Sequence, residues 1–411
     1  LISSFRAIVE TEDFMTISQL VTQVDGSMLQ QVYADAPSWK QETFKYYSEF
    51  TRALSAGGVG SPDSFNATLR DSATRYPIGV IGELNGSARA TTIDRQVLED
   101  AGVTVHLLND TPGQIVHRIV PEGASLDLCR ETLEKMHTSE PAYSIGYVPD
   151  NDGDRGNLVY VGRDGTARTL QAQAVFALSC LSELAFLSYL RSKNGLSQTL
   201  DDTVVVANGP TSMRVDRIAE FFGARVELAE VGEANVVGLA RELRETRLTV
   251  RFLGEGSNGG NITHPAACRE PLNTLFSILK LMLIRGEPDR PGLFEMWCET
   301  SGQRHLYRED FVLEDIVESI PHFVTTSAYE DRAIMRISAT NHARLKAEYE
   351  TAFQESWPEM QEYLERELGV HRWTAINYEG TKASVGVGNR DLEGPQKGGL
   401  KIVLGGPGGE R

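Results

Sequence analysis

Three aspartates crowd into five residues of the stretch YVPDNDGDRGNL. Asp150, Asp152 and Asp154 alternate with other residues between two β-rich runs, and Arg155 follows them directly. Carboxylates within hydrogen-bonding range repel by about 1 to 4 kcal/mol per pair, so solvation, a raised pKa or a hard divalent cation must offset their charge. Alternate spacing lets the three side chains converge, which favours the cation. An exposed turn rich in Asp, Asn and Gly is the alternative that needs no ligand.

A calcium-binding EF-hand also begins D-x-D-x-D, but the rest of its pattern is missing. With Asp150 as position 1, position 6 is Arg155 instead of Gly, and position 12 is Val161 instead of Glu. Strands instead of helices are predicted on both sides of the loop. The spacing therefore excludes an EF-hand.

The elements that must position this loop follow a βαβ pattern from about residue 77. YPIGVIGE, VTVHLL, AYSIGYV and NLVYVG predict strands, and ARATTIDRQVLEDAG and SLDLCRETLEKMH predict helices. The pattern returns downstream with the strands TVVVA, ARVEL and LTVRFL and the helices SMRVDRIAEFFG and ANVVGLARELRET. Each unit leads to a polar loop, PDNDGDRGN or GEGSNGGN. Because ligands of open α/β sheets bind at the carboxyl ends of strands, we expect chemistry at both loops.

The two units also match letter by letter. Both begin Asn-Gly and carry Asp-Arg in the helix ahead of a glycine, with Asp94 before Gly102 and Asp216 before Gly223. The register slips by one residue between them. Duplication of one α/β domain is our interpretation, although any strand, turn, helix and glycine cap share such letters.

Composition limits the classes of partner. A chain of 411 residues predicts two to four domains. Acidic residues outnumber basic ones by 57 to 40, and no Lys/Arg run is visible, so we expect no nucleic-acid partner.

The four cysteines form no C-x-x-C pair, which predicts buried free thiols and a cytoplasmic location. AQAVFALSCLSELAFLSYL contains Glu183 and three serines, which favours a core helix over a membrane span.

The sequence pattern changes after about residue 300. NHARLKAEYETAFQESWPEMQEYLEREL predicts a charged helical stretch interrupted by Pro358, and GGLKIVL predicts a short strand. We therefore expect a separate C-terminal α+β domain.

The two polar loops resemble those of the α-D-phosphohexomutases, which include phosphoglucomutase and phosphomannomutase. The family's metal loop, D-G-D-x-D-R, stands here as DNDGDR with Asn151 in place of Gly. Its sugar loop, G-E-x-S-G, stands here as GEGSN with Asn258 in place of Gly. ANGPTS is similar to the opening of the family's third domain, and KGGLKIVL to a strand of its fourth.

The resemblance implies an α/β fold of duplicated mixed-sheet domains of the phosphohexomutase type, with a C-terminal α+β domain. It implies a Mg²⁺-dependent enzyme that interconverts hexose 1-phosphate and hexose 6-phosphate through a phosphoserine and a 1,6-bisphosphate. Arg155 would steady a phosphate or the serine loop. The remaining implied site residues are Asp150, Asp152 and Asp154 for Mg²⁺ and Glu255, Ser257 and Asn258 for the hydroxyls of the hexose phosphate substrate.

The resemblance also implies domain boundaries and missing parts. The family's serine loop, T-x-S-H-[ND]-P, does not occur in this sequence, and R-x-S-G-T-E-P does not follow KGGLKIVL, so no serine is assigned. Because the chain opens on Leu1 and closes on LGGPGGER, we expect these loops in segments outside this sequence. The alternatives are a sugar-phosphate-binding protein that has lost its nucleophile and a metal-dependent phosphatase, which would not explain GEGSN.

The expected domains are a remnant of the serine-bearing domain (1–40), a metal-loop domain (41–172), a sugar-loop domain (173–300) and an incomplete C-terminal domain (301–411).

Overall fold

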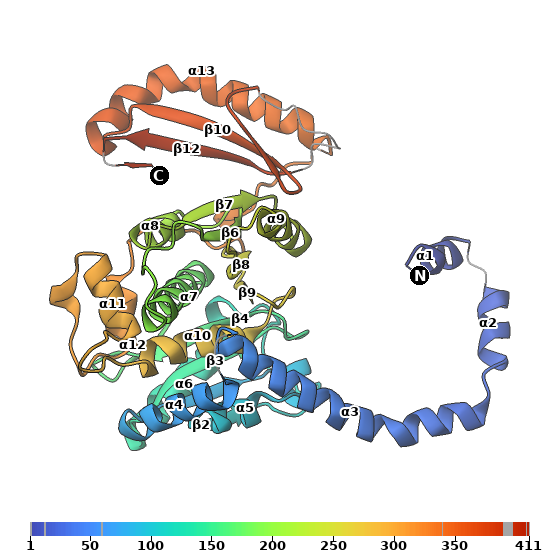
Figure 1. Cartoon of the computed structure of the whole chain (residues 1–411). Coiled ribbons are helices and arrows are strands. Elements are labelled where there is room, and N and C mark those ends of the chain that lie inside the picture. Colours follow the sequence, from blue (N-terminus) through green and yellow to red (C-terminus); the bar gives the residue numbers. More distant parts are fainter. Residues whose placement is uncertain are drawn as a thin grey trace. The chain divides into compact units, whose positions relative to one another are not determined.

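The computed structural model describes residues 2–11, 14–58, 61–338, 340–388, 398–407 and 409–410. The chain divides into two compact units, Leu1–Phe50 and Thr51–Arg411. The first unit consists of helices, namely α1 (Ile2–Glu10), α2 (Phe14–Thr22) and most of α3 (Gly26–Ser55), which continues into the second unit (Figure 1). Among the described side chains of the first unit, no apolar one is buried. All the strands among the described residues belong to the second unit.

The first α/β module is built around a five-stranded mixed sheet. Its elements are α4 (Pro62–Arg75), β1 (Gly79–Glu83), η1 (Ala88–Thr91), α5 (Asp94–Asp100), β2 (Thr104–Leu108), η2 (Gly123–Leu126), α6 (Asp127–Ser139), β3 (Tyr143–Pro149), β4 (Gly156–Val161) and β5 (Ala167–Thr169). The strand order is β2-β1-β3-β4-β5. β1 pairs in parallel with β2 and β3, whereas β4 runs antiparallel to β3 and β5. β1 and β4 are buried along their whole length, which explains their continuous apolar runs.

The second α/β module repeats this plan with a four-stranded sheet. Its elements are α7 (Ala172–Lys193), β6 (Val204–Asn208), α8 (Arg214–Phe221), β7 (Arg225–Ala229), α9 (Glu233–Glu245), β8 (Phe252–Glu255), β9 (Gly260–Thr263) and α10 (Pro271–Leu283). The strand order is β7-β6-β8-β9. β6 pairs in parallel with β7 and β8, and β9 returns antiparallel to β8. The acidic loop therefore joins β3 to β4, and GEGSNGGN joins the equivalent strands β8 and β9.

The duplicated mixed-sheet fold predicted from the sequence is confirmed by this shared topology. The letter-by-letter match holds only in part, because Asp94 begins α5 whereas Asp216 is the third residue of α8. The predicted helix ARATTIDRQVLEDAG was also too long. Its first part forms the short 3₁₀ helix η1, in which Ser87 Oγ accepts from the backbone N–H of Arg89 (3.3 Å) and so caps a separate turn.

Helix α7 is long and apolar enough to cross a membrane, but its surroundings are protein. It packs against α8, α10 and α11 (Leu293–Thr300), and 83% of its most apolar window is buried. The core-helix interpretation of AQAVFALSCLSELAFLSYL is thus supported by its packing. Cys129, Cys180 and Cys298 are buried free thiols as predicted, whereas Cys268 is exposed because it lies in the irregular segment between β9 and α10.

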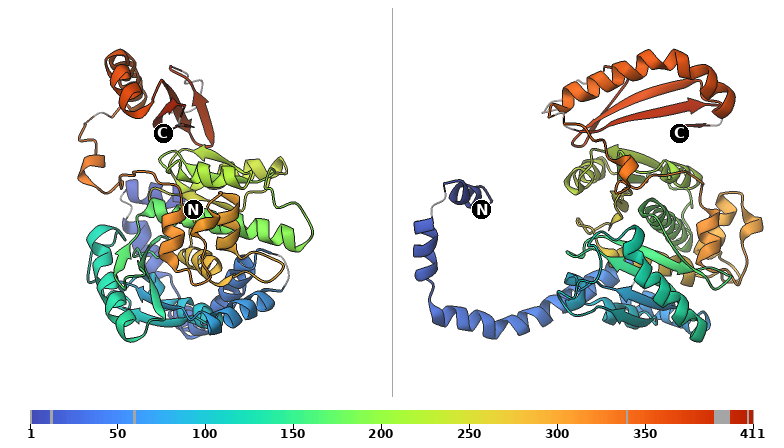
Figure 2. Two further views of the ribbon diagram at one scale, coloured as in Figure 1. Left: turned by 90° about the vertical axis from the view of Figure 1, so that its left-hand side faces the viewer. Right: turned by 180° about the vertical axis from the view of Figure 1, so that it is seen from behind.

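The remaining elements follow α10. They are α11, η3 (Arg304–Leu306), α12 (Leu313–Ser319), η4 (Asp331–Ala333), α13 (His342–Leu368), β10 (Arg372–Glu379), β11 (Lys382–Val385), β12 (Leu400–Gly406) and β13 (Gly409–Glu410). β10 to β13 form an antiparallel sheet in the order β11-β10-β12-β13. α13 lies along one face of this sheet (Figure 2), where Phe353 packs edge-on against Trp373 with ring centroids 4.8 Å apart.

The predicted interruption at Pro358 was wrong, because α13 continues through it from His342 to Leu368. The helix has one face on the sheet and the other in solvent. Pro358 has no N–H and removes one backbone hydrogen bond, but the helix is long and capped at both ends and continues past this loss. Asn341 caps its N-terminus by accepting from the N–H of Arg344 (3.0 Å), and Gly369 ends it with φ +63°. The domain boundaries expected from the sequence remain a prediction.

A buried ion cluster lies in the core of the second module. Glu183 of α7 pairs with Lys280 of α10 and accepts from Arg251 Nε (2.7 Å) and Ser277 Oγ (3.0 Å). Burial alone would raise the pKa of Glu183, but the two adjacent cations outweigh it and lower the pKa from 4.5 to about 2. The carboxylate therefore stays charged at neutral pH and balances two buried cations.

We predict that Glu183→Gln lowers the free energy of unfolding at pH 7 by about 3 to 5 kcal/mol, because Lys280 and Arg251 are left buried without their anion. A depressed carboxyl pKa contributes stability above pH 4.5 that is lost as pH falls toward 2. The gap between wild type and Glu183→Gln should therefore narrow below pH 4.5. Urea denaturation followed by circular dichroism at pH 7 and pH 3.5 measures both effects. The control is Glu355→Gln on the exposed face of α13, and equal stabilities of the two variants at pH 7 would contradict the prediction.

Candidate functional site

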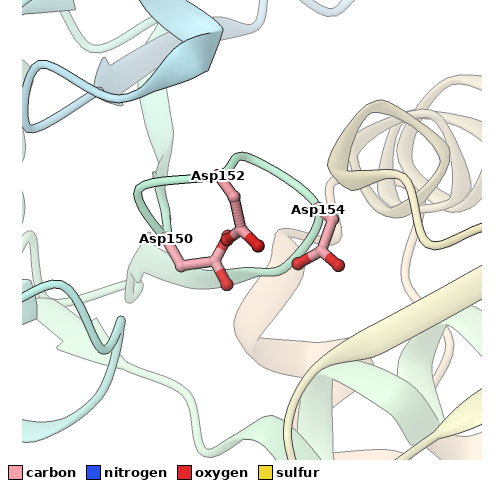
Figure 3. Close-up of side chains that lie close together, drawn as sticks. All are labelled: Asp150, Asp152 and Asp154. Atoms are coloured by element: carbon pink, nitrogen blue, oxygen red, sulfur yellow. The ribbon is translucent and has the colours of Figure 1, made fainter. Parts of the chain in front are cut away.

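The metal loop is the connection between β3 and β4. Pro149 and Gly156 form the last pair of that antiparallel ladder, and the N–H of Asp150 donates to the carbonyl of Arg155 (3.0 Å). The hairpin closes the loop tightly, and its three aspartates point to one side (Figure 3). One carboxylate oxygen from each of Asp150, Asp152 and Asp154 lies within 4.8 Å of the other two. The three carboxylates predicted to converge do converge.

Asp150 is the buried member of the group. Its Oδ1 accepts from the N–H groups of Gly153 (3.2 Å) and Arg155 (3.1 Å), and its Oδ2 accepts from Arg155 Nε (2.7 Å). Burial raises the pKa of Asp150, whereas the hydrogen bonds and charge of Arg155 act in the opposite direction. The hairpin therefore orients this carboxylate before any ligand binds.

Asp154 is held from outside its own loop. Its Oδ2 accepts from Arg269 Nη2, and its Oδ1 lies 3.6 Å from Arg155 Nε. That Oδ1 atom is buried and has no hydrogen-bond donor among the described residues. Asp152 is exposed. An orphaned buried oxygen beside two further carboxylates is a donor set of hard oxygens, which fits Mg²⁺ or Ca²⁺ better than a softer metal.

Arg155 has a structural partner that the sequence did not indicate. Besides its bonds to Asp150, its Nη1 donates to the hydroxyl of Tyr329 (2.9 Å). Tyr329 lies in the irregular segment between α12 and α13. The guanidinium thus joins the metal loop to this segment, while its other N–H groups have no acceptor among the described residues and can donate to an anion.

The sugar loop is the equivalent connection between β8 and β9, and Glu255 pairs with Gly260 at its base. Glu255 is buried. Its Oε1 accepts from Gly232 N–H (2.7 Å) and Asn208 Nδ2 (3.2 Å), and its Oε2 accepts from Asn258 Nδ2 (3.0 Å) and lies 3.5 Å from Arg269 Nη1. The carboxylate is therefore fully engaged by the protein.

Ser257 and Asn258 are the half-buried members of the sugar loop. Ser257 Oγ accepts from Asn208 Nδ2 (3.1 Å), and Asn258 Oδ1 accepts from Gly260 N–H (3.1 Å). Ser257 keeps its own O–H for another acceptor. Together with Glu255 they present one donor and several acceptors on one loop.

The metal loop and the sugar loop lie against each other. A Cβ atom built on Gly259 would sit 3.1 Å from the carbonyl oxygen of Gly156, so the two backbones approach closely at positions without side chains. Arg269 adds an ionic link, because its guanidinium contacts both Asp154 and Glu255. The structure thus brings all seven predicted residues to one region of the second unit.

Sequence reasoning missed three residues that hold these loops. Arg269 had no visible signal, because it stands alone in the irregular segment before α10. Asn85 and Asn208 did carry a signal, since both belong to the repeated Asn-Gly. Asn85 Nδ2 donates to Asn151 Oδ1 of the metal loop (3.4 Å), as Asn208 Nδ2 donates to the sugar loop. In each module, the asparagine near the end of the first strand supports the functional loop.

No family model and no curated protein matches the sequence. Solved structures do match. Parafusin, a phosphoglucomutase from Paramecium in an open form, is 14% identical, with 89% of this chain and 53% of that chain covered at a TM-score of 0.50. A phosphoglucomutase/phosphomannomutase family protein from Burkholderia thailandensis is 16% identical, with 53% and 42% covered at 0.38. N-acetylphosphoglucosamine mutase from Aspergillus fumigatus, bound to GlcNAc-6P and magnesium, is 13% identical, with 64% and 54% covered at 0.34.

The match to parafusin shows the fold, and the chain thus has the fold of the α-D-phosphohexomutases, as the resemblance implied. The chain spans about half the length of the solved structures it matches, or 42% to 53% of the first three.

The backbone of the metal loop gives a test of how tightly it is packed. Gly153 has φ +78°, and a Cβ atom there would lie 2.8 Å from Arg89 Cδ. Gly165 has nearly the same φ, +79°, but faces open space. We predict that Gly153→Ala lowers stability by about 1 to 3 kcal/mol and that Gly165→Ala costs only the backbone strain, about 1 kcal/mol. Thermal denaturation of the two variants compares these costs, and equal losses would show that Arg89 makes room without penalty.

Proposed function

We propose that this chain carries the metal-binding and sugar-binding parts of a Mg²⁺-dependent phosphohexomutase. Such an enzyme interconverts hexose 1-phosphate and hexose 6-phosphate through a phosphoserine and a 1,6-bisphosphate. The proposal rests chiefly on one observation, which is that an aspartate triad and a polar Glu-x-Ser loop, far apart in sequence, meet at equivalent strand ends of two duplicated modules. Ligands of open α/β sheets bind at such ends.

The metal loop would hold the ion through Asp150, Asp152 and Asp154. When bound, Mg²⁺ supplies positive charge that neutralises the phosphoryl oxygens during transfer. Arg155 keeps Asp150 oriented through Nε, and its remaining N–H groups can donate to a phosphate oxygen. We assign the phosphoserine to no residue of this chain.

The sugar loop would hold adjacent hydroxyls of the hexose. Ser257 can donate to one hydroxyl oxygen, and Glu255 can accept from its neighbour. Because both oxygens of Glu255 are engaged, a sugar hydroxyl must replace one of its protein contacts. The contact to Arg269 is the longest at 3.5 Å, and we assign the sugar hydroxyl to that position.

The proposal predicts that the full-length protein converts glucose 1-phosphate or mannose 1-phosphate to the 6-phosphate, given Mg²⁺ and a trace of the 1,6-bisphosphate. Asp152→Asn should lower the rate at least about 10-fold and raise the Mg²⁺ concentration needed for half-maximal activity, because one ligand of the ion loses its charge. Its fold should persist, since Asp152 is exposed and its loss relieves repulsion. A coupled assay of 6-phosphate release measures both quantities.

The matched control is Asp110→Asn, an exposed aspartate outside the two loops, which should behave as wild type. Wild-type activity in Asp152→Asn would disprove the metal assignment. Binding of hexose phosphates without turnover would favour the alternative, a sugar-phosphate-binding protein without catalysis. Release of inorganic phosphate would favour a phosphatase.

A separate prediction concerns the sugar loop. Glu255→Gln should lower kcat/KM about 100-fold, because a neutral amide is a weaker acceptor for sugar hydroxyls and presents a donor on one side. Stability should change by no more than about 1 to 2 kcal/mol, since Gln can still accept from Gly232 and Asn208. Steady-state kinetics and thermal denaturation of the same preparation separate the two effects. Glu287→Gln, a largely exposed glutamate, is the control, and normal turnover by Glu255→Gln would remove Glu255 from the sugar site.

A further inference from the structure

Arg269 lies where carboxylates from three different elements meet. Its Nη2 donates to Asp154 of the metal loop, its Nη1 lies 3.5 Å from Glu255 Oε2 at the end of β8, and its Nε lies 3.1 Å from Glu233 Oε2 at the start of α9. Its side chain is 19% exposed. A single guanidinium therefore spans both candidate loops and the helix beside them.

The fold provides a dedicated place for this side chain. A Cβ atom on Gly260 would lie 2.5 Å from Arg269 Cδ, so only glycine at that position leaves room for the arginine stem. The backbone N–H of Arg269 also donates to Glu233 Oε1 (3.2 Å), which fixes the residue at its Cα as well as at its tip. Such double anchoring keeps the guanidinium between the loops.

The next residue reaches the same loop by a second route. Glu270 pairs with Arg89 Nη1 (3.0 Å), and Arg89 packs under Gly153 of the metal loop while it pairs with Asp94 (2.5 Å). Arg89 thus reaches the metal loop at Gly153, and its carboxylate partners Asp94 and Glu270 lie outside the triad. The pair Arg269 and Glu270 therefore ties the metal loop to the second module through one contact that involves the triad and one that does not.

The charges of the metal loop indicate an electrostatic role for Arg269. Arg155 pairs with Asp150 and Arg269 pairs with Asp154, so two cations offset three carboxylates and reduce their mutual repulsion. Arg269 occupies Oδ2 of Asp154 and leaves Oδ1 without a donor, so a divalent cation coordinated through that carboxylate would lie beside the guanidinium and repel it.

We infer that Arg269 is a counter-cation of the three aspartates, which holds the metal loop together when no metal is bound and leaves Asp154 when a divalent cation binds. The metal seat is the cation site that these three aspartates form. This inference rests on the metal seat of the proposed function. Because Arg269 also contacts Glu255 and Glu233, its departure from Asp154 shifts its charge toward the sugar loop. Occupation of the metal seat is thereby linked to the charge around Glu255.

Substitution of Arg269 tests this with opposite effects on two measurements. Arg269→Gln should bind Mg²⁺ about 10-fold more tightly than wild type in isothermal titration calorimetry, because a competing positive charge is gone. The same variant without metal should unfold at a lower temperature, because Asp154, Glu255 and Glu233 lose their shared cation. A residue with a purely structural role would, when removed, weaken both metal binding and stability.

Two matched variants separate charge from packing. Arg269→Lys keeps the positive charge and should retain Mg²⁺ affinity within about 3-fold of wild type. Arg89→Gln removes the second tie and leaves the three aspartates and Arg269 in place, so it should lower the unfolding temperature without tightening Mg²⁺ binding. Asp152→Asn should weaken the titrated binding, which locates it at the triad.

The outcomes are distinct. Unchanged or weaker Mg²⁺ binding by Arg269→Gln, with normal binding by wild type, overturns the counter-cation and leaves the metal seat standing. No Mg²⁺ binding by wild type or any variant overturns the metal seat of the proposed function, and the inference with it. Tighter binding by both Arg269→Gln and Arg89→Gln also overturns the inference, because a looser loop would then explain the gain.

Discussion

Three carboxylates within 4.8 Å of one another repel, and positive charge that lies against them offsets this repulsion. The hairpin supplies Arg155 itself, but the second cation, Arg269, comes from the other α/β module. The charge of the metal loop is therefore offset in part by an ionic contact between the two modules. Gly156 and Gly259, where the two backbones approach closely, have no side chains that would keep the modules apart.

Charge compensation by protein groups is also found in the sugar loop. Glu255 is buried, and four protein groups surround its two oxygens, so the protein compensates its charge before any ligand arrives. A ligand gains there only the difference between its own hydrogen bonds and those it replaces. Under the proposed function, a hydroxyl in the wrong position would displace a protein contact without forming one of its own, which would make the site selective.

Most of the fold was predictable because the central strands β1 and β6 are buried along their whole length and appear as apolar runs. The helices were less predictable, as the short 3₁₀ turn of η1 and the uninterrupted α13 show. The candidate site residues remain predictions, although the structure brings them together. Arg269 could not be predicted, because two of its three partners, Glu233 and Asp154, lie 36 and 115 residues away and no local pattern marks it. Long-range charge pairing leaves no periodic signal in a sequence.

The repeated Asn-Gly also bears on how the protein ages chemically. Deamidation of such a pair begins when the glycine nitrogen attacks the asparagine side chain, and it turns the amide into a carboxylate. Here both asparagines are buried, and the N–H groups of Gly86 and Gly209 donate to Asn109 and Ala229 (2.9 Å each), so the folded state withholds the attacking atom. Local opening of a strand end would release it. A carboxylate formed at Asn208 would then face Glu255, and the sugar loop would lose its support through an electrostatic clash.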